Sequence, residues 1–177
     1  MTIQHPIQKK QILLIGTRSE GKLAELQSLL QDLPFEVKTL AQTSLPASFE
    51  VQETATTFEG NAIIKAMTLG TKTGYLTLAE DAGLEVDALG GRPGVYSKRF
   101  HPGTDTDRNH ALLKLMHNEK LRKARFRCVV AIYNPIDHLV QVCQGTCEGH
   151  ITTIPKGTQG FGYDPIFFSE DLQKTMA

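Results

Sequence analysis

The 177-residue sequence has no excess of charge of either sign, since 19 Lys and Arg residues balance 19 Asp and Glu residues. General binders of nucleic acid or of membrane surfaces normally carry a basic excess, so we expect neither as a partner. A long hydrophobic run is also lacking, because the apolar run at residues 12–15 is too short for a membrane span or for the core of a signal peptide. We therefore expect a cytoplasmic protein without a targeting segment.

Cysteine is scarce as well. Cys128, Cys143 and Cys147 are an odd number and lack a zinc-binding spacing, and the six histidines fit no metal spacing either. We expect reduced thiols, as in a cytosolic protein. What is present, 40% hydrophobic and 21% charged residues over 177 positions, is typical of a soluble globular chain with a single domain over residues 1–177.

Hydrophobic patterning predicts an α/β fold with a mixed sheet. Strands are expected at 11–16, 35–40, 75–79, 126–132 and 138–144, with another over 146–153. A helix is expected from the turn at 16–21 to about residue 31, with Leu23, Leu26 and Leu30 on one face. Two more are expected from about 57 to 73 and over 105–117, the latter capped by Thr104 with Asp107 three residues later. Loops are expected over 41–52, 83–103 and 156–165, where Gly, Pro, Ser and Thr gather.

The second predicted helix places polar residues with possible functions. Thr56 and Glu59 have the spacing of a capping box that opens it. The apolar positions Ile63, Ala66, Met67 and Gly70 predict the buried face, with Asn61 and Lys65 on the opposite, polar face. A lysine there either serves solubility or reaches a ligand.

The turn after the first strand is the first candidate site. Gly16-x-x-x-x-Gly21-Lys22 nearly spells a P-loop, but Leu23 stands where a P-loop needs Ser or Thr for its metal ion, so the match to that motif is incomplete. A helix N-terminus still attracts phosphate, and Arg18 and Lys22 add positive charge. An ordinary turn with a surface lysine explains this segment equally well.

The acid pair Glu80-Asp81 follows the buried strand 75–79 and is the second candidate site. Ligand sites in open α/β sheets lie beyond the carboxyl ends of strands, and adjacent carboxylates can divide metal binding from water activation. Two solvated loop acids are the plain alternative. Together with Glu53 and the lysines Lys22 and Lys65, the pair predicts a site for a metal-bound triphosphate.

Four segments make a family resemblance evident. They are TRSEGKLAEL at 17–26, ETATTFEGNAIIKA at 53–66, AEDAGLEVDALGGRPGVYSKR at 79–99 and GFGYDPIFF at 160–168. In this order they resemble the inosine triphosphate pyrophosphatase family, which clears non-standard purine triphosphates. The resemblance implies an elongated two-lobed fold on a long mixed sheet flanked by helices, with the active cleft between the lobes, Mg²⁺ dependence and usually a homodimer.

The resemblance also implies the roles of individual residues. Asp81 would activate the attacking water, and Glu53, Glu80 and Asp81 would surround the metal. Lys22 and Lys65 would grip the phosphates, and Phe161 would stack on the base. The residues implied in substrate binding are Thr17, Ser19, Lys22, Asn61, Lys65, Ala82, Phe161, Gly162, Tyr163 and Asp164. Ser97 and Arg99 match a motif near the cleft.

Three positions depart from the family pattern. Ser19 stands where the family usually has Asn, and Ala82 stands where it usually has Ser, which removes a hydroxyl near the metal. The sequence ends at Ala177, whereas family members continue through a Ser-His-Arg segment that contributes to the base pocket. The expected reaction is hydrolysis of ITP, dITP or XTP to the monophosphate and pyrophosphate. The alternatives are a protein of the same fold that binds nucleotides with little or no turnover, a related pyrophosphatase for other modified nucleotides, and a P-loop kinase.

Overall fold

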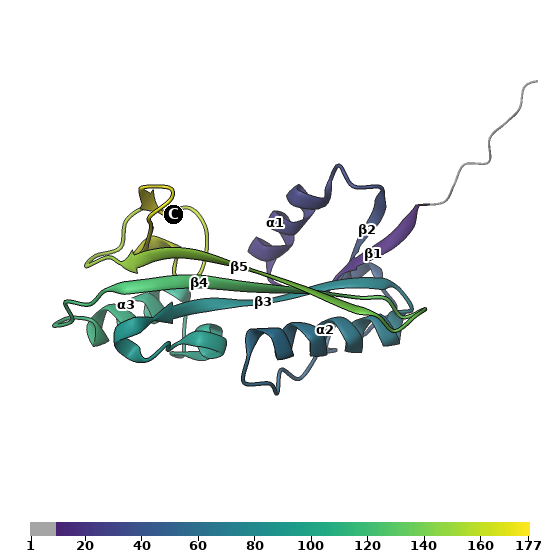
Figure 1. Ribbon diagram of the computed structural model, residues 1–177, viewed down its shortest axis with the longest axis horizontal. Helices are drawn as coiled ribbons and strands as arrows, with labels where there is room; N and C mark the ends of the chain where they lie inside the picture. The colour runs from purple at the N-terminus through teal and green to yellow at the C-terminus, as the bar shows by residue number, and fades with distance from the viewer. Residues whose placement is uncertain (1–9) are drawn as a thin grey trace, which may run out of the picture.

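The protein is described by a computed structural model over residues 10–177 (Figure 1). Residues 1–9 lie outside the described residues. They include the start of the predicted domain and most of the N-terminal segment in which we expected no targeting signal. The seven strands are β1 (Gln11–Ile15), β2 (Phe35–Thr39), β3 (Leu76–Val86), β4 (Lys123–Tyr133), β5 (Val140–Ile151), β6 (Phe167–Ser169) and β7 (Lys174–Thr175). The α-helices are α1 (Glu20–Leu30), α2 (Phe58–Thr73) and α3 (Asp105–Leu115), and short 3-10 turns are η1 (Leu40–Gln42), η2 (Asp87–Leu89), η3 (Gly94–Arg99) and η4 (Asp164–Ile166).

All seven strands form one mixed sheet in the order β2-β1-β3-β4-β5-β6-β7. β1 runs parallel to both of its neighbours, and the other pairs are antiparallel. The predicted α/β class with a mixed sheet is therefore confirmed. No helix within residues 10–177 is both long and apolar enough to cross a membrane.

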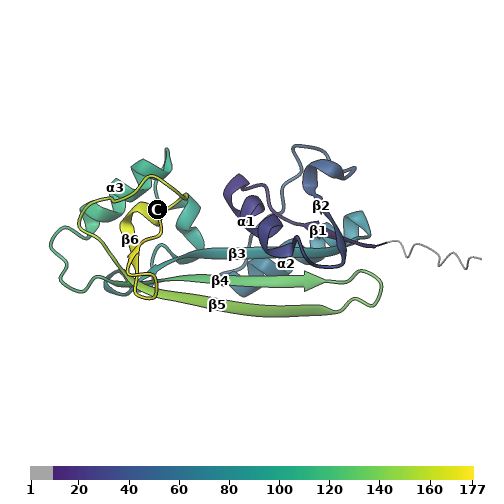
Figure 2. The ribbon, with the colours of Figure 1, turned by 90° about the horizontal axis from the view of Figure 1, so that it is seen from above.

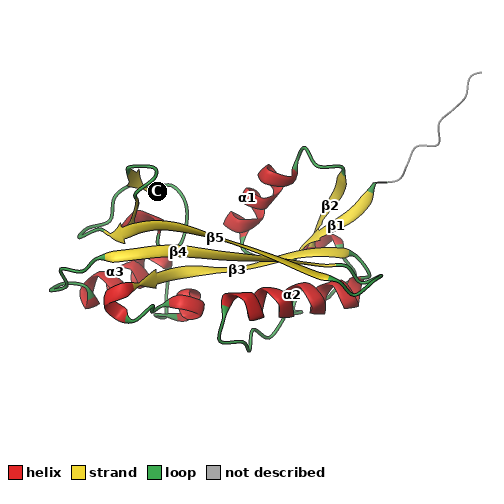
Figure 3. Cartoon of the chain, viewed as in Figure 1, coloured by secondary structure: helices red, strands yellow, loops and turns green. Residues whose placement is uncertain are grey.

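The long strands β3, β4 and β5 run through the whole molecule and connect two groups of smaller elements (Figure 2). α1, α2, β1 and β2 gather at one end, and α3, β6 and the C-terminus gather at the other. Figure 3 shows α1 and α2 on opposite sides of the sheet. The expected elongated, two-lobed form is confirmed.

The hydrophobic core follows the same division. At the α3 end, Leu112 and Met116 pack with Leu84 and Phe167. On the α1 side of the sheet, Leu30 is buried, and the other predicted face residues of that helix, Leu23 and Leu26, pack against the same cluster. On the α2 side, a third cluster contains Ala62, Ala66, Ala79 and Val129. Each α-helix thus packs in a cluster of its own, and the long strands contribute residues to all three clusters.

Two predictions about strands were wrong. β3 does not end before the acid pair but continues to Val86, because β4 supplies antiparallel partners from Thr77 to Val86. The segments predicted as separate strands at 138–144 and 146–153 form the single strand β5, which pairs with β4 from Val140 to His150. Cross-strand pairing outweighs the glycines that indicated breaks in the sequence. The short strands β6 and β7 were not predicted.

The buried face of α2 also differs from the prediction. The cap is Thr57, whose side chain accepts a hydrogen bond from Gly60 N, and not Thr56. Asn61 is fully buried, whereas Met67, predicted to face the core, is 41% exposed. Phe58, Asn61, Lys65 and Leu69 recur at helical spacing on the side that faces the sheet. The count of apolar residues predicted the wrong face for the two polar residues. Asn61 and Lys65 lie on the buried face because both donate to Asp81 of β3.

Candidate active site

The acid pair lies on an open edge of β3. β1 pairs with β3 only up to Leu78, where Gly16 N donates to Leu78 O at 2.7 Å. Further along, the same edge is covered again where Leu84 N donates to Ser97 Oγ at 2.9 Å and Pro93 forms a bridge with Glu85. Between these points, no described strand pairs with this side of β3. The carboxyl end of β1 points at this gap, so the rule that ligand sites follow strand ends holds for β1 and not for β3.

The two acids point to opposite faces of the sheet, because successive side chains of a strand alternate. Glu80 faces α1, and its Oε2 lies 2.8 Å from Lys22 Nζ. Asp81 faces α2, where its Oδ2 accepts from Asn61 Nδ2 at 3.1 Å and its Oδ1 accepts from Lys65 Nζ at 3.2 Å. Both carboxylates are nearly buried, at 6% and 7% exposure. They are therefore not solvated loop acids.

Lys65 joins Asp81 to the third predicted acid. Its ammonium also lies 2.9 Å from Glu53 Oε1, so one cation bridges two carboxylates. Burial alone would lower the pKa of Lys65, but the charges of Asp81 and Glu53 outweigh burial and raise it. Burial likewise acts to raise the pKa of Glu53, yet the hydrogen bond and charge of Lys65 lower it. Lys65 and Glu53 thus stay charged over a wide pH range.

Asp81 behaves differently from Glu53. Burial raises its pKa above the ordinary value, and this effect exceeds the opposing effects of Lys65 and Asn61. The like charge of Glu53 acts in the same direction as burial. A carboxylate with a raised pKa takes a proton more readily, which suits a group that deprotonates water.

The start of α1 borders the same open edge. Ser19 is the N-cap residue but its side chain forms no capping bond, and Ser19 N donates to Thr17 Oγ1 at 3.2 Å. The first-turn N–H groups can therefore meet an anion. Arg18, which we expected to add charge for a phosphate, donates instead to the carbonyl oxygens of Pro46 and Phe49. Its guanidinium holds the 41–52 loop, and Lys22 is the lysine that reaches the acid pair.

The 160–164 loop comes from the opposite lobe and reaches α1. A Cβ atom added at Gly21 would lie 2.4 Å from Cδ1 of Phe161, so the Phe161 ring rests on the first turn of α1. Asp164 Oδ2 accepts from Phe161 N at 2.8 Å and fixes the turn. Tyr163 is buried, and its hydroxyl donates to Ser97 O at 2.8 Å. Phe161 therefore contacts the first turn of α1, whereas Tyr163 and Asp164 hold the loop in shape.

Two residues that support this loop were missed from the sequence. Asp105 Oδ2 accepts from Gly162 N at 2.8 Å, and Asn109 Nδ2 donates to Gly162 O at 3.1 Å. They stand four apart on α3, whose start was predicted from the Thr104 cap, so their common face was visible in the sequence. A hollow of about 350 Å³ lies between α3 and the 155–165 segment. Ser97 holds the edge of β3, and Arg99 lies over the ring of Tyr96.

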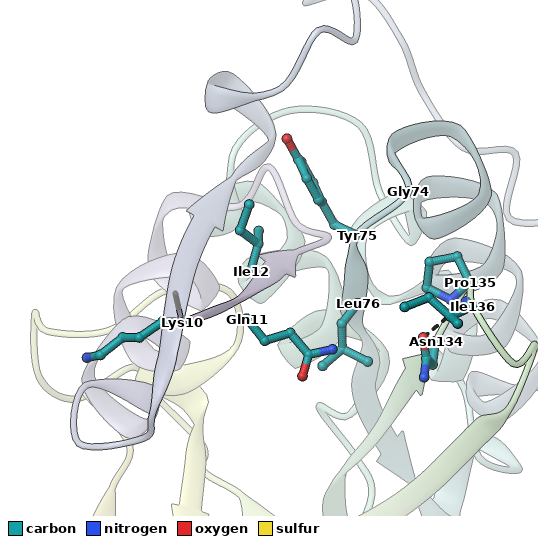
Figure 4. A pocket seen from close by; sticks show the side chains of 9 residues that line it. All are labelled: Lys10, Gln11, Ile12, Gly74, Tyr75, Leu76, Asn134, Pro135 and Ile136. Carbon is teal, nitrogen blue, oxygen red and sulfur yellow. Dashed lines mark hydrogen bonds between the residues drawn. The ribbon is translucent and has the colours of Figure 1, made fainter. Parts of the chain in front are cut away.

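A second hollow, of about 270 Å³, lies away from the acid pair (Figure 4). It is lined by the start of β1, by Tyr75 and Leu76 and by the turn at Asn134 to Ile136. Among the described residues that line it, Lys10 is the one that carries a charge. None of the predicted site residues borders it, and we assign it no role.

The described residues 10–177 gather no group of three or more His, Cys, Asp or Glu side chains closely enough to hold a metal ion. The three predicted ligands are instead paired with lysines, Glu80 with Lys22 and the other two with Lys65. Ala82 follows the acid pair on the open edge, half-buried. The structure thus brings together Glu53, Glu80 and Asp81 with the two predicted phosphate lysines.

The chain resembles known proteins over most of its length. The model of the Ham1 family matches residues 13–177. A dITP/XTP pyrophosphatase of Bacillus licheniformis is 43% identical over 169 residues, which cover 93% of this chain and 85% of the relative. A dITP/XTP pyrophosphatase of a Nostoc species is also 43% identical, over 94% of this chain and 82% of the relative. The solved structure of a HAM1 protein from Coxiella burnetii superposes with a TM-score of 0.84 at 38% identity, covering 94% of this chain and 86% of that one. The chain belongs to the Ham1 family.

Proposed function

We propose that this protein hydrolyses non-standard purine nucleoside triphosphates, such as ITP, dITP and XTP, to the monophosphate and pyrophosphate. The observation that carries the proposal is the buried acid pair at the open edge of β3, in which Asn61 and Lys65 hold Asp81. Lys22 holds Glu80 on the other face of the strand. The names of the relatives from Bacillus licheniformis and Nostoc support the same substrate class.

The reaction begins with a water molecule that attacks the α-phosphorus. Asp81 takes the proton of this water, which its raised pKa favours. The bond between the α-phosphorus and the oxygen that bridges to the β-phosphorus breaks, and pyrophosphate leaves with that oxygen. Lys22, Lys65 and the first turn of α1, with Thr17 and Ser19, bind the negative charge of the phosphates. Ala82 contributes its backbone on the edge of β3.

The residues fit a Mg²⁺ ion in their chemistry, since Glu53, Glu80 and Asp81 offer the carboxylate oxygens that this ion prefers. In their present arrangement, lysine ammonium groups neutralise these carboxylates. When bound, Mg²⁺ would neutralise part of the charge on the phosphates. Because the two acids of the pair point to opposite faces, a ligand shared by both must approach from the open edge of β3.

Base recognition falls to the 160–164 loop. Phe161 stacks on the purine, and Gly162, Tyr163 and Asp164 shape the pocket in the cleft between the lobes. A site that hydrogen-bonds a 6-oxo group rejects an amino group at that position by orders of magnitude.

We also propose a cytoplasmic homodimer that binds neither nucleic acid nor membranes. Size-exclusion chromatography with light scattering tests the dimer.

The deciding experiment is a substrate panel of ITP, dITP, XTP, ATP and GTP with Mg²⁺, with identification of both products. We expect monophosphate and pyrophosphate from the first three. Asp81→Asn should lower turnover by about 10²–10⁴-fold, because it removes the base. Glu85→Gln, on the same strand but paired with Arg125 and Arg127, is the matched control and should retain activity.

Each other outcome would support a different function. Saturable ITP binding without any product would establish a nucleotide-binding protein and contradict the proposal. Turnover of methylated pyrimidine triphosphates alone would indicate the related pyrophosphatase. Transfer of a γ-phosphate to an acceptor would indicate a kinase.

A further inference from the structure

Asn61 connects the catalytic carboxylate to the loop that carries Glu53. Its side chain is fully buried, and both ends of its amide have partners. Nδ2 donates to Asp81 Oδ2 at 3.1 Å, and Oδ1 accepts from Ala55 N at 3.0 Å. We propose that Asn61 is a positioning residue that fixes Asp81 and the Glu53 loop relative to each other without touching the substrate. This inference rests on the proposed function.

The backbone determines which way the Asn61 amide points. Ala55 N–H is a donor and needs an oxygen, so the oxygen end of the amide turns to Ala55 and the amino end must face Asp81. An aspartate at this position would satisfy Ala55 but turn an oxygen towards the Asp81 carboxylate. A leucine, which has the same branched shape, would satisfy neither partner. Asparagine is thus the residue of this size that serves both contacts.

The start of α2 is shaped to bring the loop to Asn61. Thr57 caps the helix by accepting from Gly60 N at 3.0 Å. A Cβ atom at Gly60 would lie 2.6 Å from the Cβ of Ala55, so the loop packs where a side chain is missing. Ala55 is thereby placed under Asn61, two residues after Glu53.

The contacts close into a ring. From Asp81 it passes through Asn61 to Ala55, along the chain to Glu53, and through Lys65 back to Asp81. Asn61 holds Oδ2 of Asp81 and Lys65 holds Oδ1, so both carboxylate oxygens are fixed. Without Asn61, one oxygen loses its partner and the carboxylate can rotate. A supporting residue of this kind typically contributes 10–100-fold to activity.

The test compares Asn61→Asp and Asn61→Leu with wild type. Each is assayed for kcat and KM with ITP and for exchange of the Ala55 amide hydrogen. We expect kcat to fall by about 10–100-fold in both variants while KM stays within about threefold, because Asn61 does not contact the substrate. The Ala55 amide should stay protected in Asn61→Asp, which keeps the acceptor, and exchange faster in Asn61→Leu.

Asn109→Leu is the matched control, since Asn109 is likewise buried but holds Gly162 O instead of Asp81. It should alter KM rather than kcat. Melting temperatures separate a loss of fold from a loss of position. A wild-type kcat in both Asn61 variants, or a rise in KM with kcat unchanged, would overturn the positioning role alone. Failure of the wild type on every triphosphate of the panel would instead overturn the proposed function.

Discussion

Replacing Lys65 with methionine tests the electrostatic centre of the site. The Lys65 ammonium lies 2.9 Å from Glu53 and 3.2 Å from Asp81, and its side chain is only 13% exposed. Lys65→Met keeps the unbranched shape of the side chain, one atom shorter, but leaves two partly buried carboxylates without their shared cation. Removing one partner of a buried ion pair costs about 3–5 kcal/mol, and the partial exposure of Glu53 favours the lower end, about 3 kcal/mol. In a chain of this size, that corresponds to a drop in melting temperature of about 6–12 °C.

The pH dependence of this loss follows from the directions of the pKa shifts. Lys65 has a raised pKa, so its contribution to stability is fully present at neutral pH and is lost only as pH rises through that raised value. Glu53 has a lowered pKa, so its contribution is present at neutral pH and is lost as pH falls through that lowered value. The difference between wild type and Lys65→Met should therefore be large near pH 7 and shrink in acid.

Thermal denaturation followed by circular dichroism from pH 3 to pH 8 measures this difference. Lys123→Met is the matched control, because Lys123 is 54% exposed and lies 3.6 Å from Glu148. It should change stability by less than about 1 kcal/mol. If Lys65→Met has the same melting temperature as this control at pH 7, the ion pairs do not hold the site together and the reasoning fails.

Two further predictions concern the loop at Phe161 and the cysteines. Gly21→Ala would place a methyl group 2.4 Å from the Phe161 ring and displace the ring. KM for ITP should then rise about 5-fold or more, since base stacking is worth ~1–3 kcal/mol. Gly145→Ala, whose added methyl group meets nothing within 4 Å, should not change KM, and equal KM values in the two variants would contradict the stacking role. Burial and the negative charge of Glu80 raise the pKa of Cys128 to about 11, so only about one molecule in a thousand carries the thiolate at pH 8. Iodoacetamide at that pH should label the exposed Cys143 well before Cys128, as peptide mass spectrometry will show, and equal labelling rates would refute the effect of burial.

Local pattern predicted the elements whose signals are themselves local. The apolar face of α1 and the start of α3 at Thr104 follow from side chains within one or two helical turns, and both predictions are confirmed. The Thr56 cap was wrong by one residue. The spacing to Glu59 favoured Thr56, but the side chain that accepts from Gly60 N and caps the helix is that of Thr57. The length of β3 and the unity of β5 depend on pairing with β4, which no local pattern contains.

The motifs of the sequence determined the family and the set of residues that meet in the site, because each motif keeps its chemical groups at fixed short spacings. Only the tertiary structure decided how these groups are arranged. The alternation of β3 sends Glu80 to α1 and Asp81 to α2, and the early end of β1 leaves the strand edge between them open. The tertiary structure also decided that Arg18 holds a loop and that Asn61 is buried against Asp81, because the partners of these two residues lie 20 to 31 residues away in the chain.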